Sequence, residues 1–120
     1  MAAHLKDKKA QIFKRQMIND GMGGGSTAYI PISPAPLWCY ARQLSQDVIT
    51  SLRAADMQEK RYFVFNYRPD VAVGDFVLYR ETWYSITRVD TQDDYRGDLF
   101  VYVKDCDDIP RQGELRPYSA

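Results

Sequence analysis

The sequence has very few of the residues on which catalytic and metal sites depend. Its 120 residues include one histidine, His4, and two cysteines, Cys39 and Cys106. A histidine this close to the N-terminus is a poor general base, because the first residues of a chain are seldom held in a fixed geometry. Two distant cysteines make neither a CxxC metal motif nor a disulfide framework, so we expect buried free thiols. These scarcities predict a protein that is not an enzyme and has no metal or cofactor site.

An excess of charge of one sign is missing as well. Sixteen basic residues balance sixteen acidic ones, so the chain as a whole has no general attraction for nucleic acid or membranes. No apolar run approaches the roughly 20 residues of a membrane helix, and the first residues, MAAHLKDKKAQ, lack the apolar core of a signal peptide. We therefore expect no membrane partner, and synthesis and assembly in the cytoplasm.

The charges are nevertheless unevenly divided. Residues 1–60 carry eight Lys or Arg and five Asp or Glu, whereas residues 61–120 carry eight and eleven. Halves of opposite charge suit a head-to-tail contact between copies, although an ordinary solvated surface explains them more simply.

What the sequence does contain is mostly β-strand pattern. RYFVFNYR (61–68), DFVLYRE (75–81), WYSITRVD (83–90) and LFVYVKDC (99–106) are rich in aromatic and β-branched residues. Residues 37–44 fit a further strand, 10–18 fit a strand or a helix, and three prolines make 28–36 an extended or edge segment. The pattern predicts a mainly β fold, a small six-stranded β-barrel or sandwich with one short helix or helical loop and a long Gly-rich hairpin loop. We expect one domain with a flexible N-terminus (1–9), a barrel core (10–106) and an extended C-terminal tail (107–120) that leaves the body.

Three loops are candidates for function. NDGMGGGST, Asn19 to Thr27, is not a phosphate-binding loop, because no Lys precedes Ser26 and no helix can follow it. Such a Gly-rich loop is costly to order, so we expect contact with a partner to fix it. SQDVITSLRAADMQEK, Ser45 to Lys60, has apolar residues at roughly helical spacing and predicts the short helix or helical loop. The acidic loop TQDDYRGD misses the spacing of a calcium-binding loop, so it is expected to be a solvated turn.

The hairpin GDFVLYRETWYSITRVD carries bulky residues on both faces. One face of a barrel strand is core, so bulk on the other face indicates that the outside is buried too, for example against copies of the chain. Trp83 and Tyr84 suit either face. Exposed aromatic residues also suit single-stranded nucleic acid, but this half of the chain is acidic and repels phosphate.

The order of these pieces resembles the tailed-phage head-tail joining family, which includes the head-closure, or stopper, proteins of siphophages. The resemblance covers residues 10–106 and depends on a Trp-led strand, a turn, the two halves of the hairpin and a closing strand. These pieces are Trp38 to Arg42, the turn with Tyr67, Arg68 and Asp70, VLY and WYSITRVD, and the strand that ends in Cys106. The prolines before Trp38 and the long Ser45 to Lys60 insert depart from the family pattern.

The resemblance implies a structural virion protein of the phage neck. Its relatives are β-barrels that assemble with themselves as a ring, commonly of twelve copies, under the portal and its adaptor. The ring retains packaged double-stranded DNA, which passes through the channel without sequence-specific binding, and it provides the docking surface for the tail-completion or tail terminator protein. Alternatives are another neck ring, such as an adaptor or tail-completion protein, and a small-barrel protein that binds single-stranded nucleic acid.

The resemblance also implies three groups of site residues. The candidate channel or gating loop comprises Gln46, Asp47, Val48, Ile49, Leu52, Arg53, Asp56 and Met57. The candidate partner-contact loop comprises Asp20, Gly21, Met22, Gly23, Gly24 and Gly25. The candidate interface residues are Trp83, Tyr84, Asp93 and Asp94.

Overall fold

The computed structural model describes residues 6–19, 25–43, 59–91, 97–106 and 109–118. The candidate channel loop lies outside these ranges, and so do Asp93, Asp94 and residues 20–24 of the candidate partner-contact loop. The helix or helical loop predicted between Ser45 and Lys60 is outside them over residues 45–58. In the described ranges, no helix is long and apolar enough to cross a membrane.

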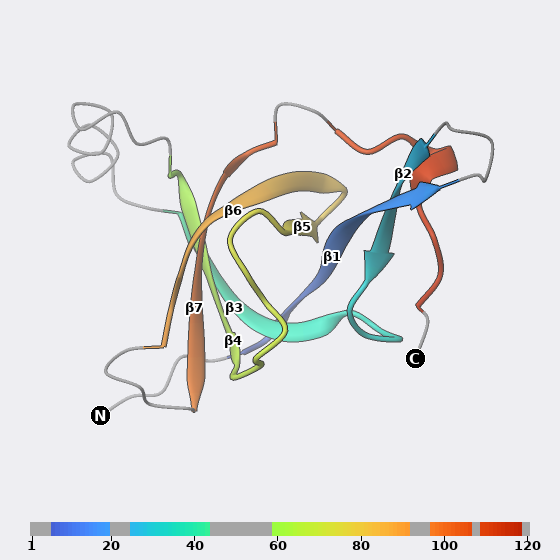
Figure 1. Cartoon of the computed structure of the whole chain (residues 1–120). Coiled ribbons are helices and arrows are strands. Elements are labelled where there is room, and N and C mark those ends of the chain that lie inside the picture. Colours follow the sequence, from blue (N-terminus) through green and yellow to red (C-terminus); the bar gives the residue numbers. More distant parts are fainter. Residues whose placement is uncertain (1–5, 20–24, 44–58, 92–96, 107–108, 119–120) are drawn as a thin grey trace, which may run out of the picture.

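Seven strands form one sheet that closes on itself (Figure 1). The strand order is β2-β1-β3-β4-β7-β6-β5, and a further pairing of β1 with β5 closes an antiparallel barrel of six strands with β2 outside it. The predicted mainly β, six-stranded barrel is therefore confirmed. The elements are β1 (Lys8–Asn19), β2 (Gly25–Pro31), β3 (Leu37–Gln43), β4 (Arg61–Asn66), β5 (Phe76–Tyr79), β6 (Thr82–Asp90), β7 (Asp98–Asp105) and the 3-10 helix η1 (Gln112–Glu114).

β1 is long enough to take part in two structures. Its first part pairs with β3 over Lys8 to Ala10 and with β5 over Gln11 to Phe13, which closes the barrel. Its second part, Phe13 to Asn19, pairs with β2 and projects from the barrel as a two-stranded arm (Figure 1). β2, which ends at Pro31, therefore occupies the edge position that the prolines predicted for residues 28–36. β1 also begins inside the stretch predicted as a flexible N-terminus, since Lys8 and Lys9 are strand residues.

The proline-rich segment between β2 and β3 is a bulge against β1. Pro31 pairs with Phe13 and Leu37 pairs with Ala10, so the five residues 32–36 lie opposite only two residues of β1, Gln11 and Ile12. The Ile32 amide still donates to the Ile12 carbonyl at 2.9 Å. The excess residues loop out, because prolines cannot donate to the ladder.

A second bulge, in β6, decides which side chains enter the barrel. The pairing of β6 with β7 shifts between Ile86 and Arg88. Tyr84 and Ile86 point inward before the shift, and Val89 points inward after it, where it packs against the core. The extra residue reverses the alternation and turns Arg88 to the outside, over the ring of Tyr102.

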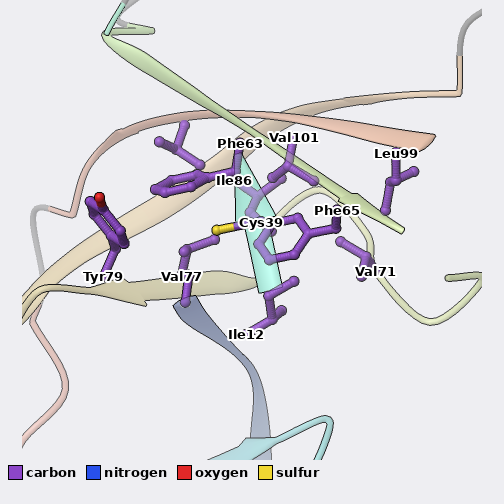
Figure 2. Packing of buried hydrophobic residues seen from close by; sticks show 12 residues of the cluster. Ile12, Cys39, Phe63, Phe65, Val71, Val77, Tyr79, Ile86, Leu99 and Val101 are labelled. Atoms are coloured by element: carbon purple, nitrogen blue, oxygen red, sulfur yellow. The ribbon is translucent and has the colours of Figure 1, made fainter. Parts of the chain in front are cut away.

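The barrel interior is a closely packed apolar core (Figure 2). Phe63 and Phe65 of β4 fill its centre, with ring centroids 6.0 Å apart. Leu99, Val101 and Val103 face it from β7, because alternate residues of a strand point to the same side, and each is at most 1% exposed. Cys39 is fully buried there, so the free thiol predicted at this position is confirmed.

A second buried cluster lies on the outside of the barrel. Phe13, Tyr29 and Phe76 form it, and Trp83, Cys106 and Leu115 pack against it. The contribution of Leu115 corrects one expectation, because the C-terminal tail does not leave the body over its described residues 109–118. Leu115 forms a parallel bridge with Tyr29, and the Arg116 amide donates to the Tyr29 carbonyl at 2.9 Å. The tail returns because the outer aromatic side chains of the arm and hairpin offer Leu115 an apolar surface.

Candidate functional site

The connection from β3 to β4 is far longer than its geometry requires. Gln43 and Arg61 are cross-strand partners, and two residues can join antiparallel neighbours. The chain instead uses seventeen residues, 44–60, and this connection contains the whole candidate channel loop. Connections of this length are uncommon inside compact domains and are usually either functional segments or unstructured linkers.

The C-terminal end of this connection is fastened to the β6 bulge by a buried carboxylate. Glu59 is 2% exposed. Thr87 Oγ1 donates to Glu59 Oε2 at 2.8 Å, and Arg88 Nη2 donates to Glu59 Oε1 at 3.0 Å. The next residue is held as well, because the Lys60 amide donates to the Val103 carbonyl at 3.0 Å. Sequence reasoning missed Glu59, since one acidic residue before a strand carries no signal without knowledge of the bulge.

Beside this anchor, the outer surface of β3, β4 and β7 carries a group of rings, Tyr40, Tyr62, Phe100 and Tyr102, which we name the tyrosine face. Tyr62 is its centre, with ring centroids 6.2 Å from Tyr40, 6.1 Å from Phe100 and 5.8 Å from Tyr102. All four are partly exposed. Partial burial and the neighbouring Tyr40 raise the pKa of Tyr62 above its ordinary value. The Arg88 guanidinium lies 3.9 Å from the Tyr102 ring centroid, which links the tyrosine face to Glu59.

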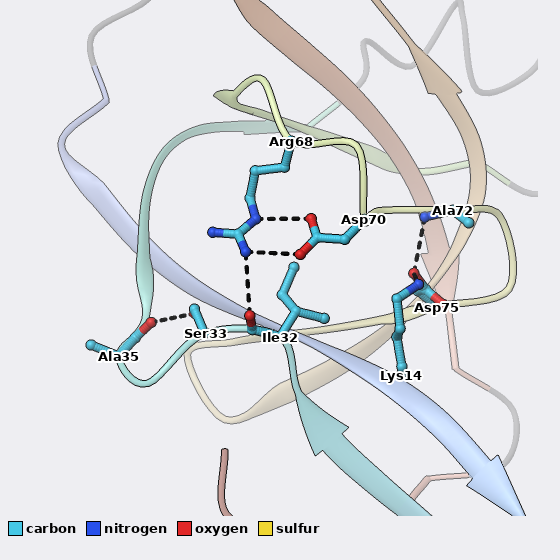
Figure 3. Close-up of polar contacts among 8 residues, drawn as sticks. All are labelled: Lys14, Ile32, Ser33, Ala35, Arg68, Asp70, Ala72 and Asp75. Carbon is cyan, nitrogen blue, oxygen red and sulfur yellow. Dashed lines mark hydrogen bonds and ion pairs between the residues drawn. The ribbon is translucent and has the colours of Figure 1, made fainter. Parts of the chain in front are cut away.

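The junction of arm and barrel is held by an ion pair in the turn after β4 (Figure 3). Arg68 Nε and Nη2 donate to the two carboxylate oxygens of Asp70 at 3.0 and 2.8 Å. Nη2 also donates to the Ile32 carbonyl at 3.3 Å, so the turn grips the proline bulge. The hydrogen bonds from Arg68 hold the pKa of Asp70 below its ordinary value. The YRPD turn that carried the family resemblance is therefore a clamp between β4 and the β2–β3 bulge.

A second carboxylate ties the same region to β1. Asp75 accepts from Lys14 Nζ at 2.8 Å and from the Ala72 amide at 2.9 Å (Figure 3). Next to it lies an open hollow of about 450 Å³. Its lining includes Lys14, Gln16, Ile30, Ile32, Asp70 and Tyr118.

The candidate interface residues Trp83 and Tyr84 both pack within the subunit, on opposite faces of β6. The Trp83 ring lies 4.9 Å from Phe13 and 6.4 Å from Tyr29 in the outer cluster. The Tyr84 ring lies 6.0 Å from Phe63 in the core. Each keeps a partly exposed edge.

The described residues contain no group of three or more His, Cys, Asp or Glu side chains placed to hold a metal ion. Burial raises the pKa of the Cys39 thiol to about 12, so this thiol is a packing group and not a nucleophile.

Comparison with known proteins decides the family. A family model described as phage head completion protein matches residues 1–105. The chain belongs to this family. The resemblance to head-tail joining proteins is thereby confirmed, and membership implies a structural component of the virion that interacts with other head or tail proteins.

The fold of this head completion protein is also found in a solved structure. The solution structure of protein SF1141 from Shigella flexneri 2a matches with a TM-score of 0.73 and 14% sequence identity, over 91% of this chain and all of that one. At this identity the likeness is one of fold alone. No curated protein matches the chain. The family match includes the barrel, the arm and the long connection, and it ends before the C-terminal segment that covers the outer cluster.

Proposed function

We propose that this head completion protein forms the head-closure, or stopper, ring of the phage neck. The ring retains packaged DNA below the portal and its adaptor, and it presents the docking surface for the tail. Its subunits contact one another head to tail, because one face of a subunit must meet a different face of the next for a ring to close.

The observation that carries the proposal is the long connection with a fixed base. Residues 44–60 join two strands that are already hydrogen-bonded neighbours, and Glu59 fastens the end of the connection to β6. A rigid barrel that holds both ends of an oversized connection is suited to present it in a central channel. We assign this role to the candidate channel loop, whose apolar residues Val48, Ile49, Leu52 and Met57 would meet those of other subunits and close the channel.

The outer surface supports self-assembly. Two arginines adjoin the partly exposed rings of the tyrosine face: Arg42 forms side-chain hydrogen bonds with Tyr40 and Tyr62, and Arg88 lies over Tyr102. Tyr and Arg are enriched at protein interfaces. We infer that the exposed edges of Trp83 and Tyr84, with Asp93 and Asp94, contribute to the opposing side of the subunit contact. Residues 20–24 join β1 to β2, and Gly25 begins β2, so the candidate partner-contact loop lies at the tip of the arm, which suits contact with the adaptor or tail ring.

Electron microscopy of phage that carries an early stop codon in this gene tests the proposal. Heads that have lost their DNA, beside complete unattached tails, are the expected products. Heads blocked before packaging, or normal virions, would contradict head closure. If the heads keep their DNA and only the maturation of the tails fails, the protein would instead form another neck ring, such as that of a tail-completion protein.

The tyrosine face also favours a second candidate, a single-stranded nucleic-acid binder, because aromatic rings beside arginine stack bases. Binding of an oligonucleotide that weakens steeply with salt, and that Tyr62→Ala abolishes, would support this alternative. Unchanged oligonucleotide mobility at low salt would exclude it.

A further inference from the structure

Trp38 is the largest apolar side chain that the described residues leave exposed. It is 55% exposed, and it lies on the outer side of β3, because its neighbour Cys39 points into the core. Lys9 Nζ lies 4.5 Å from the centroid of its ring, and among the described residues Lys9 has no ion-pair partner. Tryptophan is among the residues most enriched at the energetic centres of protein interfaces. Trp38 with Lys9 is therefore suited to anchor a contact with another molecule.

Trp38 also continues a surface that the proposed ring already uses. Tyr40, two residues further along β3, is on the same side of the strand and belongs to the tyrosine face. A subunit contact through the tyrosine face therefore brings Trp38 toward the neighbouring subunit.

The hollow at the junction of arm and barrel has the size and the chemistry to receive an indole ring. Its volume of about 450 Å³ lies within the roughly 300–1,000 Å³ of pockets that bind ligands. Ile30, Pro31 and Ile32 line it with apolar groups. Asp70 also lines it, with a side chain that is 39% exposed while it holds Arg68, and a carboxylate can accept from more than two donors. The hollow thus offers apolar contact for the ring and an acceptor for the indole N–H, which needs a partner when it is buried.

A subunit cannot place its own Trp38 in its own hollow, because the two lie on opposite sides of β1. Ile12 of β1 points into the core, and Lys14 and Gln16, which line the hollow, are on the same side of the strand as Ile12. Lys9 is on the other side, and Trp38 is its cross-strand partner there. A contact between Trp38 and the hollow therefore joins two copies of the chain, and it is heterologous, because two different surfaces meet.

We propose that Trp38 of one copy of the chain docks in the hollow of the next copy. The inference specifies the head-to-tail contact of the proposed ring and rests on it. A second copy is the occupant that the chemistry favours: Trp38 and Lys9 present an apolar ring, an N–H donor and a cation, and the hollow presents an apolar wall and the Asp70 carboxylate. Each subunit has one such ring and one such hollow, so the same contact repeats from subunit to subunit.

Photo-crosslinking of the full-length chain tests this contact. The variant Trp38→p-benzoylphenylalanine keeps an aromatic side chain at the position. The unlabelled variant is mixed with an excess of ¹⁵N-labelled wild-type chain, concentrated and irradiated, and the cross-linked peptides are sequenced by mass spectrometry. We expect hybrid products in which residue 38 of the unlabelled chain is joined to residues 30–32 or to Tyr118 of the labelled chain. Hybrid products joined elsewhere, or no hybrid products at any concentration, would overturn the proposal.

Filling the hollow provides a matched pair of variants. Ile30→Trp in the labelled chain places an indole ring in the hollow and should lower the hybrid yield several-fold. Val73→Trp adds the same ring at a 64% exposed position of the β4–β5 turn that does not line the hollow, and it should leave the yield unchanged. Thermal unfolding verifies that each labelled chain is folded. Equal yields from the two folded chains would contradict docking in the hollow.

A second pair of variants leaves the hollow as it is. Lys9→Gln in the unlabelled chain removes the cation beside the ring and should lower the hybrid yield. Lys8→Gln should not, because the Lys8 ammonium is already paired with Asp7 at 3.1 Å. A yield that Lys9→Gln leaves unchanged would contradict the approach of Lys9 to Asp70.

Native mass spectrometry of the same samples separates this inference from the proposed ring. Rings without the hybrid products would refute the Trp38 contact alone. Hybrid products in open chains would refute the closed ring alone.

Discussion

Arg88 Nη2 donates a 3.0 Å hydrogen bond to Oε1 of the buried Glu59 carboxylate, and so ties the end of the long connection to the bulge of β6. We expect Arg88→Met to lower the free energy of unfolding by about 1–3 kcal/mol, because it leaves a buried acceptor with fewer partners. Urea denaturation of the purified chain measures the change.

The neighbouring ion pair between Lys60 and Asp105 provides the control. Its side chains are 45% and 60% exposed, so Lys60→Met should cost less than about 1 kcal/mol. If Arg88→Met and Lys60→Met lowered the free energy of unfolding equally, Arg88 would act only as a surface charge. A smaller loss of unfolding free energy in Glu59→Gln than in Arg88→Met would mean that the amide oxygen of glutamine still accepts the hydrogen bond from Thr87.

Asp70 should make stability depend on pH in acid solution. Its pKa in the folded chain lies below its ordinary value of 3.8, owing to the hydrogen bonds from Arg68. The stabilisation is therefore complete above about pH 4 and is lost as the pH falls through the lowered pKa. Urea titrations at pH 6 and pH 3 should show the wild type losing more stability than Asp70→Asn. In an Arg68→Met background the same substitution should no longer alter the pH dependence, and a persistent difference would place the cause elsewhere.

The tip of the β5–β6 hairpin is strained. Arg80 and Glu81 have φ of 49° and 66°, the left-handed pair of a two-residue turn that favours Asn-Gly. We expect Glu81→Gly to raise the free energy of unfolding. The substitution removes about 1–2 kcal/mol of backbone strain, which exceeds the roughly 0.5–1 kcal/mol that the extra conformational entropy of glycine costs. Thermal unfolding measures this.

Gly74→Ala is the opposite case: φ at Gly74 is 95° and an added Cβ would meet no atom, so backbone strain alone should lower the melting temperature.

The sequence predicted those parts of the fold that follow from local pattern. Leu99, Val101 and Val103 face the core because strand alternation is intrinsic to the backbone, and the prolines placed β2 at an edge. The pattern did not reveal the bulge between Ile86 and Arg88, which depends on the pairing with β7 and creates the Glu59 anchor. Nor did it reveal the return of Leu115 to Tyr29, because that contact joins residues far apart in the chain.

The two cysteines should differ in reactivity. Burial raises the pKa of Cys39 to about 12, whereas Cys106 is partly exposed at the outer cluster. Iodoacetamide at pH 8 should therefore alkylate Cys106 in the folded chain and leave Cys39 unmodified until denaturant is added. Mass spectrometry of tryptic peptides reads both sites, and rapid labelling of Cys39 under native conditions would contradict its place in the core.

The connection between β3 and β4 should be dispensable for folding and essential for head closure. Replacing residues 46–57 by Gly-Gly keeps Glu59, and shortening a loop changes the free energy of unfolding by only about 1 kcal/mol. Phage with this variant should form heads that package DNA and then lose it, as counted by electron microscopy and by DNA content of purified heads. A full-length variant with Val48, Ile49, Leu52 and Met57 changed to serine separates apolar closure from loop length. DNA loss in both variants supports a hydrophobic gate, and retention in both would contradict the channel role.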